Sequence, residues 1–121
     1  MQERDLLRDL ARRYVDICQR PEQQERRQLW RRHNSLQSTR PPIYIRAFAW
    51  QEMEEAQLHC EDPLWRSYED FFRRHLFWDS LADDSIFEPW VTVRAQHNCS
   101  GWGVQAERRR TEDLHGSFKV D

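Results

Sequence analysis

The sequence lacks a long hydrophobic run. A membrane-spanning helix needs an uninterrupted apolar stretch of roughly 18–20 residues. No stretch of this 121-residue chain reaches that length. The opening residues, MQERDLLRDL, also lack the apolar core of a secretory signal peptide. We therefore expect a cytoplasmic protein that has no membrane partner.

Cysteine is scarce, and its spacing is uninformative. The chain has three cysteines, Cys18, Cys60 and Cys99. Their odd number and the lack of a Cys-x-x-Cys pair argue against a disulfide framework. Zinc needs three or four nitrogen and sulfur ligands. The chain offers one candidate set, of unrecognised spacing: His59, Cys60, His97 and Cys99. We expect no metal in this chain, and a small metal or thiol enzyme that uses Cys60, His97 and Cys99 is the weakest alternative.

Several short catalytic and nucleotide-binding motifs are also missing. The chain has only three glycines, and it contains no glycine-rich phosphate loop. It has neither a Gly-x-Ser-x-Gly nucleophile turn nor a His-Glu-x-x-His zinc motif. The local signatures of several common enzyme classes are therefore absent.

Aromatic and charged residues are abundant instead. The six Trp and six Phe residues indicate one core of bulky side chains. Together with a net charge of only −2, they argue against disorder over most of the chain. The first fifty residues hold 11 basic and 6 acidic side chains, whereas the next fifty hold 4 basic and 11 acidic. Because the basic residues are interspersed with Glu and Asp, we assign both excesses to solvated helix faces and expect no nucleic-acid partner.

Hydrophobic periodicity predicts three helices. Residues 4–19 form an amphipathic pattern, and residues 22–36 continue with good helix formers but few apolar anchors. Asp62 is a candidate N-cap before Pro63, which suits the first helical position. Residues 64–78 then carry a broad apolar stripe.

Two segments predict strands. Residues 43–50 are apolar on both alternating faces, which is typical of a parallel strand covered by helices. Residues 85–88 are a second extended segment that ends at Pro89, because proline cannot donate to a sheet ladder. With the helix between them, these segments predict a βαβ unit with parallel neighbouring strands. The residues after Trp90 predict a loop-rich tail.

Three spread motifs carry a family resemblance: LWRRHNSLQSTRPPIYI, CEDPLWRSYEDFFRRHLFWDSLADDSIFEPW and SGWGV. Together they resemble the opening third of the uroporphyrinogen decarboxylase superfamily, and they look closest to its corrinoid-linked methyltransferase-like branch. The resemblance implies an α/β fold. Residues 1–38 would be a helical extension, and residues 39–121 would hold the first two β/α units of an incomplete TIM-type barrel.

The resemblance also implies a chemistry for full-length relatives. Members of that branch move a methyl group between a corrinoid protein and a thiol or pterin acceptor, using zinc, whereas the decarboxylases use no metal. The chain ends after about two of eight β/α units, so the zinc ligands of the methyltransferases cannot be carried over. The implied partners are a corrinoid protein or the missing remainder of the barrel, and the chain alone would be inactive.

Four residues are candidates for a site. Glu88 ends the second predicted strand, where TIM-barrel function gathers, so it could orient a substrate or accept a proton; a structural bond is the alternative. Arg46 must pair with a carboxylate such as Glu88, or bind an anion, because it lies within an apolar strand. Trp50 and Trp90, with Trp102, could line a substrate pocket, although filling a core or interface is the commoner role.

A second function class follows from the same pattern. Two parallel strands leave unpaired edges and exposed aromatic faces, which favour self-association or a partner chain. The alternative to an enzyme fragment is therefore a binding or assembly module that forms a homo-oligomer or pairs with another chain through exposed strand edges.

Overall fold

The computed structural model describes residues 2–47, 49–96, 98–99, 101 and 103, together with the backbone of residues 108–109 and 119–120. The chain divides into two compact units, Met1–Trp90 and Val91–Asp121. The predicted boundary after Ser38 therefore falls inside the first unit. Among the described residues, no helix is both long and apolar enough to cross a lipid bilayer.

Two consecutive helices open the first unit. Helix α1 spans Glu3–Cys18 and helix α2 spans Pro21–Asn34. The break between them lies at Arg20, which is extended and precedes Pro21 at the first position of α2. This is expected, because the residue before a proline is disfavoured in the helical region while proline itself suits a helix start.

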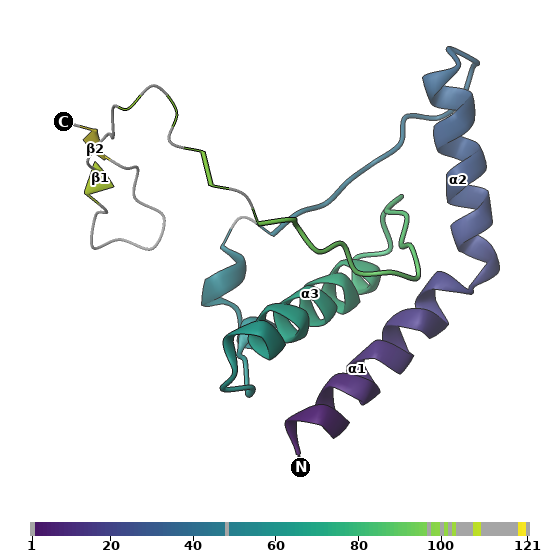
Figure 1. Cartoon of the computed structure of the whole chain (residues 1–121). Coiled ribbons are helices and arrows are strands. Elements are labelled where there is room, and N and C mark those ends of the chain that lie inside the picture. Colours follow the sequence, from purple (N-terminus) through teal and green to yellow (C-terminus); the bar gives the residue numbers. More distant parts are fainter. Residues whose placement is uncertain are drawn as a thin grey trace. The chain divides into compact units, whose positions relative to one another are not determined.

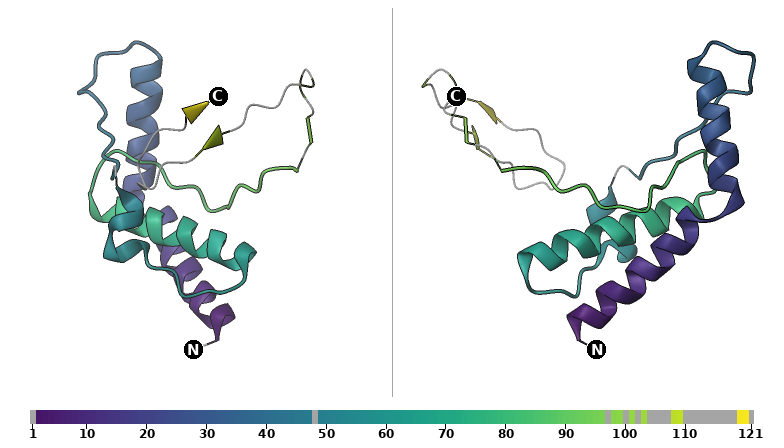
Figure 2. Two further views of the ribbon diagram at one scale, coloured as in Figure 1. Left: turned by 90° about the vertical axis from the view of Figure 1, so that its left-hand side faces the viewer. Right: turned by 45° about the vertical axis from the view of Figure 1, so that its right-hand side comes forward.

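The third helix, α3, spans Pro63–Ser80, and its start is fixed by a side-chain cap. Oδ1 of Asp62 accepts hydrogen bonds from the N–H groups of Leu64 at 2.9 Å and Trp65 at 3.1 Å. Figures 1 and 2 show α3 packed along α1, with α2 continuing beyond the end of α1. The predicted N-cap and the three predicted helices are confirmed.

The core of this unit lies between α1 and α3. Its α1 side is an apolar stripe that includes Leu10, Tyr14 and Ile17, all almost fully buried. The Tyr14 ring contacts Phe72 of α3 at a centroid distance of 5.7 Å and Phe87 at 6.4 Å. Burial of this aromatic cluster is the main apolar contribution to the stability of the unit.

The predicted α/β fold with two β/α units of a TIM-type barrel is wrong. Among described residues 2–90 the regular elements are α1, α2, α3 and two short 3₁₀ helices, η1 (Trp50–Glu52) and η2 (Glu54–Ala56), and there is no strand. Residues 37–47 and 85–88 lie outside regular secondary structure and form no sheet with each other, and Figure 1 shows the chain between α2 and η1 drawn out in an extended path. The described strands are β1 (Arg108–Arg109) and β2 (Lys119–Val120), an antiparallel two-residue pair in the second unit.

In the second segment and the adjoining Asp84, side chains of α2 bind backbone groups that a sheet ladder would otherwise bind. Gln23, which is 1% exposed, accepts a hydrogen bond from the N–H of Phe87 at 2.8 Å. Arg26 and Trp30 of α2 donate to the carbonyl oxygens of Ser85 at 3.1 Å and Asp84 at 2.8 Å. Since buried backbone groups need partners but not a sheet ladder as such, these bonds take the place of strand pairing.

A buried carboxylate also fixes the loop before α3. Glu69 is 0% exposed, and it accepts hydrogen bonds from the N–H groups of His59 at 2.9 Å and Cys60 at 2.8 Å. Arg73, one turn further along α3, donates to it at 2.7 Å. Burial opposes ionisation of Glu69, but the bonds from Cys60, Arg73 and His59 outweigh burial and lower its pKa to about 2.

We predict that Glu69→Gln destabilises the first unit by roughly 3 kcal/mol, because it removes the carboxylate partner of Arg73 and leaves a buried N–H without its acceptor. Urea unfolding followed by tryptophan fluorescence measures this loss. The exposed Glu54 supplies the matched control, Glu54→Gln. Equal unfolding midpoints for the two variants would contradict the assignment. The contribution of Glu69 should be complete above about pH 4.5 and lost as the pH falls through about 2.

Candidate functional site

Two adjacent aspartates after α3 hold the extended segment 37–47. Asp84 accepts a hydrogen bond from the N–H of Ile43 at 2.8 Å, and Asp83 accepts one from the N–H of Ile45 at 2.8 Å. The N–H of Asp84 donates back to the carbonyl oxygen of Ile43 at 2.9 Å. Both aspartates are 6% exposed. We call Asp83 and Asp84 the aspartate clamp.

The turn that presents the clamp is tight. Ala82 lies at φ 52°, in the left-handed region that a residue with a Cβ rarely occupies. Asp83 accepts a hydrogen bond from the N–H of Ser85 at 2.9 Å, which closes the turn on itself. The strained residue immediately before the clamp is therefore held by bonds on its C-terminal side.

Two arginines neutralise the clamp. Arg40 donates to both oxygens of Asp84, at 2.7 and 2.6 Å, and Arg46 donates to Asp83 at 3.1 Å. The hydrogen bond from Arg40 lowers the pKa of Asp84 to about 2, against the opposing effect of burial, with help from the Ile43 N–H. Burial would raise the pKa of Asp83, but the bonds from Ile45 and Ser85 outweigh it, so that this pKa is also lowered.

The side chain of Arg46 lies between two aromatic rings. Its guanidinium carbon is 4.7 Å from the ring centre of Tyr44 and 4.2 Å from that of Trp78 on α3. Trp30 stacks on Tyr44 at 4.8 Å, with an interplanar angle of 26°. Cation–π contacts of this kind fix both the arginine and the segment that carries it.

The aspartate clamp engages only one edge of the segment. In an extended chain, successive N–H and C=O groups point to opposite edges. The bonds to the clamp come from Ile43 and Ile45, whereas the backbone groups of Tyr44 and Arg46 bind no other described residue. We call this second side, formed by the backbone of residues 42, 44 and 46, the open edge.

Apolar side chains flank the open edge. Ile43 is 55% exposed, Tyr44 is 53% exposed and Ile45 is 44% exposed. Tyr44 and Arg46 share one face, as their contact shows, so that Ile43 and Ile45 lie on the opposite face. An extended backbone fixed at one edge and flanked by exposed apolar groups is the most distinctive surface of the unit.

The structure places two of the predicted site residues in separate ion pairs. Arg46 binds Asp83 and also the Ser85 hydroxyl at 3.0 Å, not Glu88. Glu88 pairs with Arg27 of α2 at 3.1 Å, and its carbonyl oxygen accepts a hydrogen bond from the Tyr14 hydroxyl at 2.7 Å. Because residues 85–88 are not a strand, the location at a strand end that suggested a catalytic role for Glu88 does not exist.

The two candidate tryptophans also lie apart. Trp50 is buried in η1, and its indole N–H donates to Asp70 at 2.8 Å. Trp90 is 60% exposed, at the end of the first unit. Among the described residues, no side-chain interaction joins any two of Arg46, Trp50, Glu88 and Trp90. Trp102 and His97 lie outside the described residues.

Within the described ranges, no group of three or more His, Cys, Asp and Glu side chains has the arrangement of a metal site. His59 and Cys60 instead form part of the loop that Glu69 fixes. Cys60 is fully buried, and burial together with the neighbouring Glu69 raises the pKa of its thiol to about 11. A thiol of this kind is a poor nucleophile near neutral pH.

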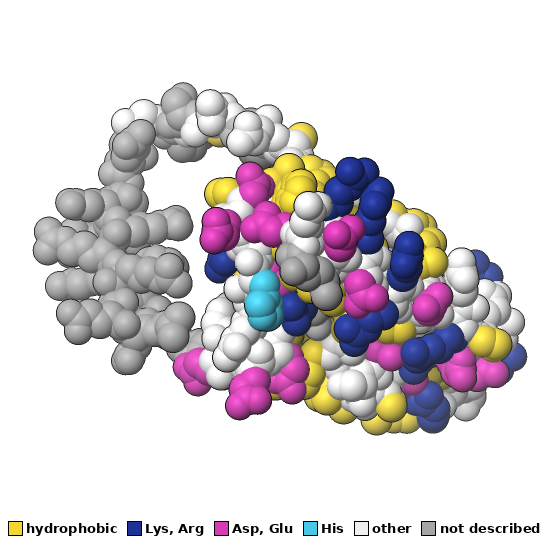
Figure 3. Space-filling view, turned by 90° about the horizontal axis from the view of Figure 1, so that it is seen from below, with side chains coloured by type: hydrophobic (Ala, Val, Ile, Leu, Met, Phe, Trp, Pro, Cys, Tyr) yellow, Lys and Arg dark blue, Asp and Glu magenta, His cyan; other side chains and the backbone are white. Residues whose placement is uncertain are grey.

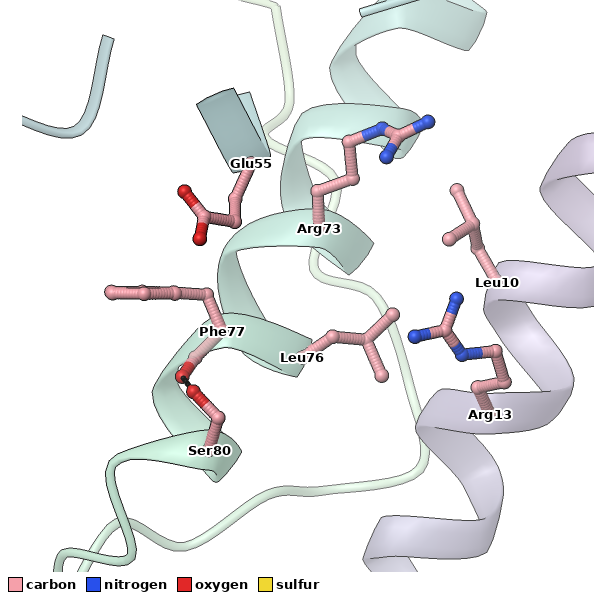
Figure 4. Close-up of a pocket in the computed structure, with 7 residues that line it drawn as sticks. All are labelled: Leu10, Arg13, Glu55, Arg73, Leu76, Phe77 and Ser80. Atoms are coloured by element: carbon pink, nitrogen blue, oxygen red, sulfur yellow. Dashed lines mark hydrogen bonds between the residues drawn. The ribbon is translucent and has the colours of Figure 1, made fainter. Parts of the chain in front are cut away.

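A groove of about 290 Å³ lies between α1 and α3 (Figure 4). Leu10 and Arg13 of α1 line it, together with four residues of α3 and Glu55 of η2. Figure 4 shows that Glu55 and Arg13 lie on opposite sides of α3 and do not converge on a common point. The groove therefore lacks the convergent polar groups that orient a small-molecule ligand.

The face seen in Figure 3 carries no patch of a single charge sign. In Figure 3 acidic and basic side chains are interspersed over the visible face of the helical unit. This distribution differs from the one-sided basic surface that nucleic-acid binding requires.

Sequence reasoning missed Asp83 and Asp84, because the stretch LADDS was interpreted only as a turn. The available signal was two acidic residues between apolar segments in a chain whose preceding half is rich in arginine. Comparison of the chain with protein families, with curated proteins and with solved structures gives no match. The resemblance to the uroporphyrinogen decarboxylase superfamily stays a prediction from the sequence.

We predict that the amide proton of Ile43 reports the ionisation of Asp84. Its chemical shift should titrate with a midpoint near pH 2, because the carboxylate that it binds has a pKa of about 2. Stabilisation by Asp84 should be complete above about pH 4 and lost as the pH falls through about 2. NMR titration measures both. The titration should vanish in Asp84→Asn, and its persistence there would show that another group is responsible.

Proposed function

We propose that the first unit is a protein-binding module that takes up an extended segment of a partner chain along the open edge of residues 42–46. The observation that carries this proposal is the asymmetry of the segment. Ile43 and Ile45 are bound through their backbone to the aspartate clamp, while the backbone of Tyr44 and Arg46 has no partner among the described residues. Addition of a strand to such an edge is an established mode of peptide recognition.

Preorganisation supports the proposal. Ordering the backbone of a free peptide costs about 1–2 kcal/mol per residue, and a partner binding to a flexible loop would have to offset that cost on both sides. Here the aspartate clamp and the stack of Arg46 between Tyr44 and Trp78 keep the segment extended. Only the incoming chain has to be ordered.

Side-chain exposure also supports the proposal. A strand added to the open edge would place its own side chains beside those of Ile43, Tyr44 and Ile45, each of which is about half exposed. Apolar cross-strand pairs contribute roughly 0.2–1 kcal/mol each. Main-chain hydrogen bonds would supply affinity, and the apolar neighbours would favour partners with β-branched or aromatic residues.

This proposal keeps the assembly-module interpretation of the sequence but changes the structural element. The edge belongs to a single extended segment held by side chains, not to a parallel sheet. Methyl transfer or decarboxylation by full-length relatives stays a prediction. Its candidate residue in this chain, Glu88, forms an ion pair with Arg27 at 3.1 Å.

We predict that the unrelated peptide Arg-Thr-Val-Thr-Val-Thr-Arg, chosen for its β propensity, binds the full chain weakly and selectively. At about millimolar peptide, NMR should show the largest shifts at the Tyr44 and Arg46 amides, because these donors of the open edge bind no other described residue. The Ile43 and Ile45 amides, already bound by the aspartate clamp, should shift less.

The control peptide carries an N-methyl group on its central threonine, which removes one donor. It should bind about fivefold more weakly, since each backbone hydrogen bond contributes about 1 kcal/mol. On the protein, Tyr44→Pro should abolish binding while Tyr44→Phe retains it. Equal binding of the two peptides, or shifts spread evenly over the first unit, would refute strand addition at this edge.

A further inference from the structure

We infer that the open edge binds a second copy of itself, so that the chain forms a two-fold symmetric dimer by antiparallel pairing of residues 42–46 about Tyr44. This inference rests on the proposed function and names its partner. A two-fold interface is self-complementary, so a segment can form one only if its own donors, acceptors and side chains match when its direction is reversed. Residues 42–46 meet that condition.

The backbone pattern matches under the two-fold operation. With the axis at Tyr44, the two copies of this residue form a hydrogen-bonded pair and exchange both N–H···O bonds. The N–H of Arg46 then meets the carbonyl oxygen of Pro42 in the other copy. Pro42 has no N–H, so no donor is left unpaired where the copies meet. Pairing about Tyr44 thus satisfies every donor on the open edge.

The side chains match as well. In this register Ile43 of one copy lies opposite Ile45 of the other, and the reverse pair is its equivalent. Both are half-exposed and lie on the same face, so that the dimer gathers all copies of these isoleucines into one apolar cluster. On the other face, Tyr44 of each copy already stacks on its own Trp30 at 4.8 Å, and pairing extends this into a continuous aromatic row.

Charge does not oppose self-pairing. The arginines nearest the edge are Arg40 and Arg46, and like charges brought together across a two-fold axis would repel each other. Each is already paired within its own copy, Arg40 with Asp84 at 2.6 Å and Arg46 with Asp83 at 3.1 Å. The dimer therefore brings together two locally neutral clusters.

The pairing is short, because Pro41 and Pro42 end it on one side. An interface of this length lies well below the roughly 800 Å² per partner of stable complexes, so we expect a weak, concentration-dependent dimer. A weak dimer dissociates on dilution during chromatography, whereas cross-linking at equilibrium traps it. The experiment therefore uses cross-linking.

The test is site-specific disulfide cross-linking of the full chain, in which Cys99→Ser first removes the exposed native thiol. Antiparallel pairing about Tyr44 places the Cα atoms of the two Tyr44 residues about 5.5 Å apart, within disulfide range. The two Ile43 residues are diagonal neighbours at roughly 7–8 Å, beyond that range. Tyr44→Cys should therefore form dimers at least tenfold faster than Ile43→Cys under a glutathione redox buffer.

Leu36→Cys gives the collision control, because Leu36 is 95% exposed and lies outside the proposed interface. Circular dichroism shows whether removing the Tyr44 ring unfolds the chain. If it does, a mixture of Ile43→Cys and Ile45→Cys chains tests the same register. In that register the Cα atom of residue 43 in one copy should lie about 4.5 Å from that of residue 45 in the other. The heterodimer should then exceed either homodimer. Cross-linking that is equal at positions 36, 43 and 44, or homodimers that match the mixed pair, would overturn the inference.

The outcomes separate this inference from the proposed function. If the unrelated peptide shifts the Tyr44 and Arg46 amides but Tyr44→Cys cross-links no faster than Leu36→Cys, the edge binds strands and the self-dimer is wrong. If neither occurs, both proposals fail. If Tyr44→Cys cross-links faster than Leu36→Cys, the result supports both the strand-binding edge and the self-dimer.

Discussion

Buried carboxylates that bind backbone N–H groups are the interaction on which the rest of this structure depends. Asp83, Asp84 and Glu69 are each at most 6% exposed, and each accepts at least one main-chain hydrogen bond from a segment outside regular helix. Each is also balanced by an arginine. An ionised carboxylate without these partners would be strongly disfavoured at such burial, so the extended segments and the arginines are required together.

The same requirement explains the uneven charge of the chain. Four arginines between positions 20 and 46 form ion pairs with acidic side chains between positions 79 and 88. The basic excess of the first fifty residues and the acidic excess of the next fifty therefore meet within one unit. The prediction that both excesses lie on solvated helix faces does not account for Asp83 and Asp84, which are buried and bind loop backbone.

The helices could be predicted because their signals are local. Apolar periodicity, Asp62 at the N-cap and prolines at positions 21 and 63 act within one or two helical turns, and the observed bounds differ from the predicted ones by only a few residues. The strands could not be predicted in the same way. Apolar alternation in residues 43–50 shows that this segment favours an extended conformation, but not which group will bind its N–H donors. Asp83 binds the N–H of Ile45 from 38 positions away. In the other extended segment, Gln23 binds the N–H of Phe87 from 64 positions away.

The candidate site, like the fold, could be predicted only where its signals are local in the sequence. The apolar residues around Arg46 in the sequence predicted a carboxylate partner such as Glu88, or a bound anion. The partner is a carboxylate, but it is Asp83, because the turn after α3 brings that residue to the segment. The backbone N–H groups of the segment that bind the aspartate clamp are those of Ile43 and Ile45, so the clamp fixes the extended conformation and leaves the other edge of the backbone open. A segment held along both edges would be closed to partners, and one held at neither would be disordered. Prolines 41 and 42 then limit how far any pairing can extend, which restricts recognition to the few residues around Tyr44 and guards against open-ended association.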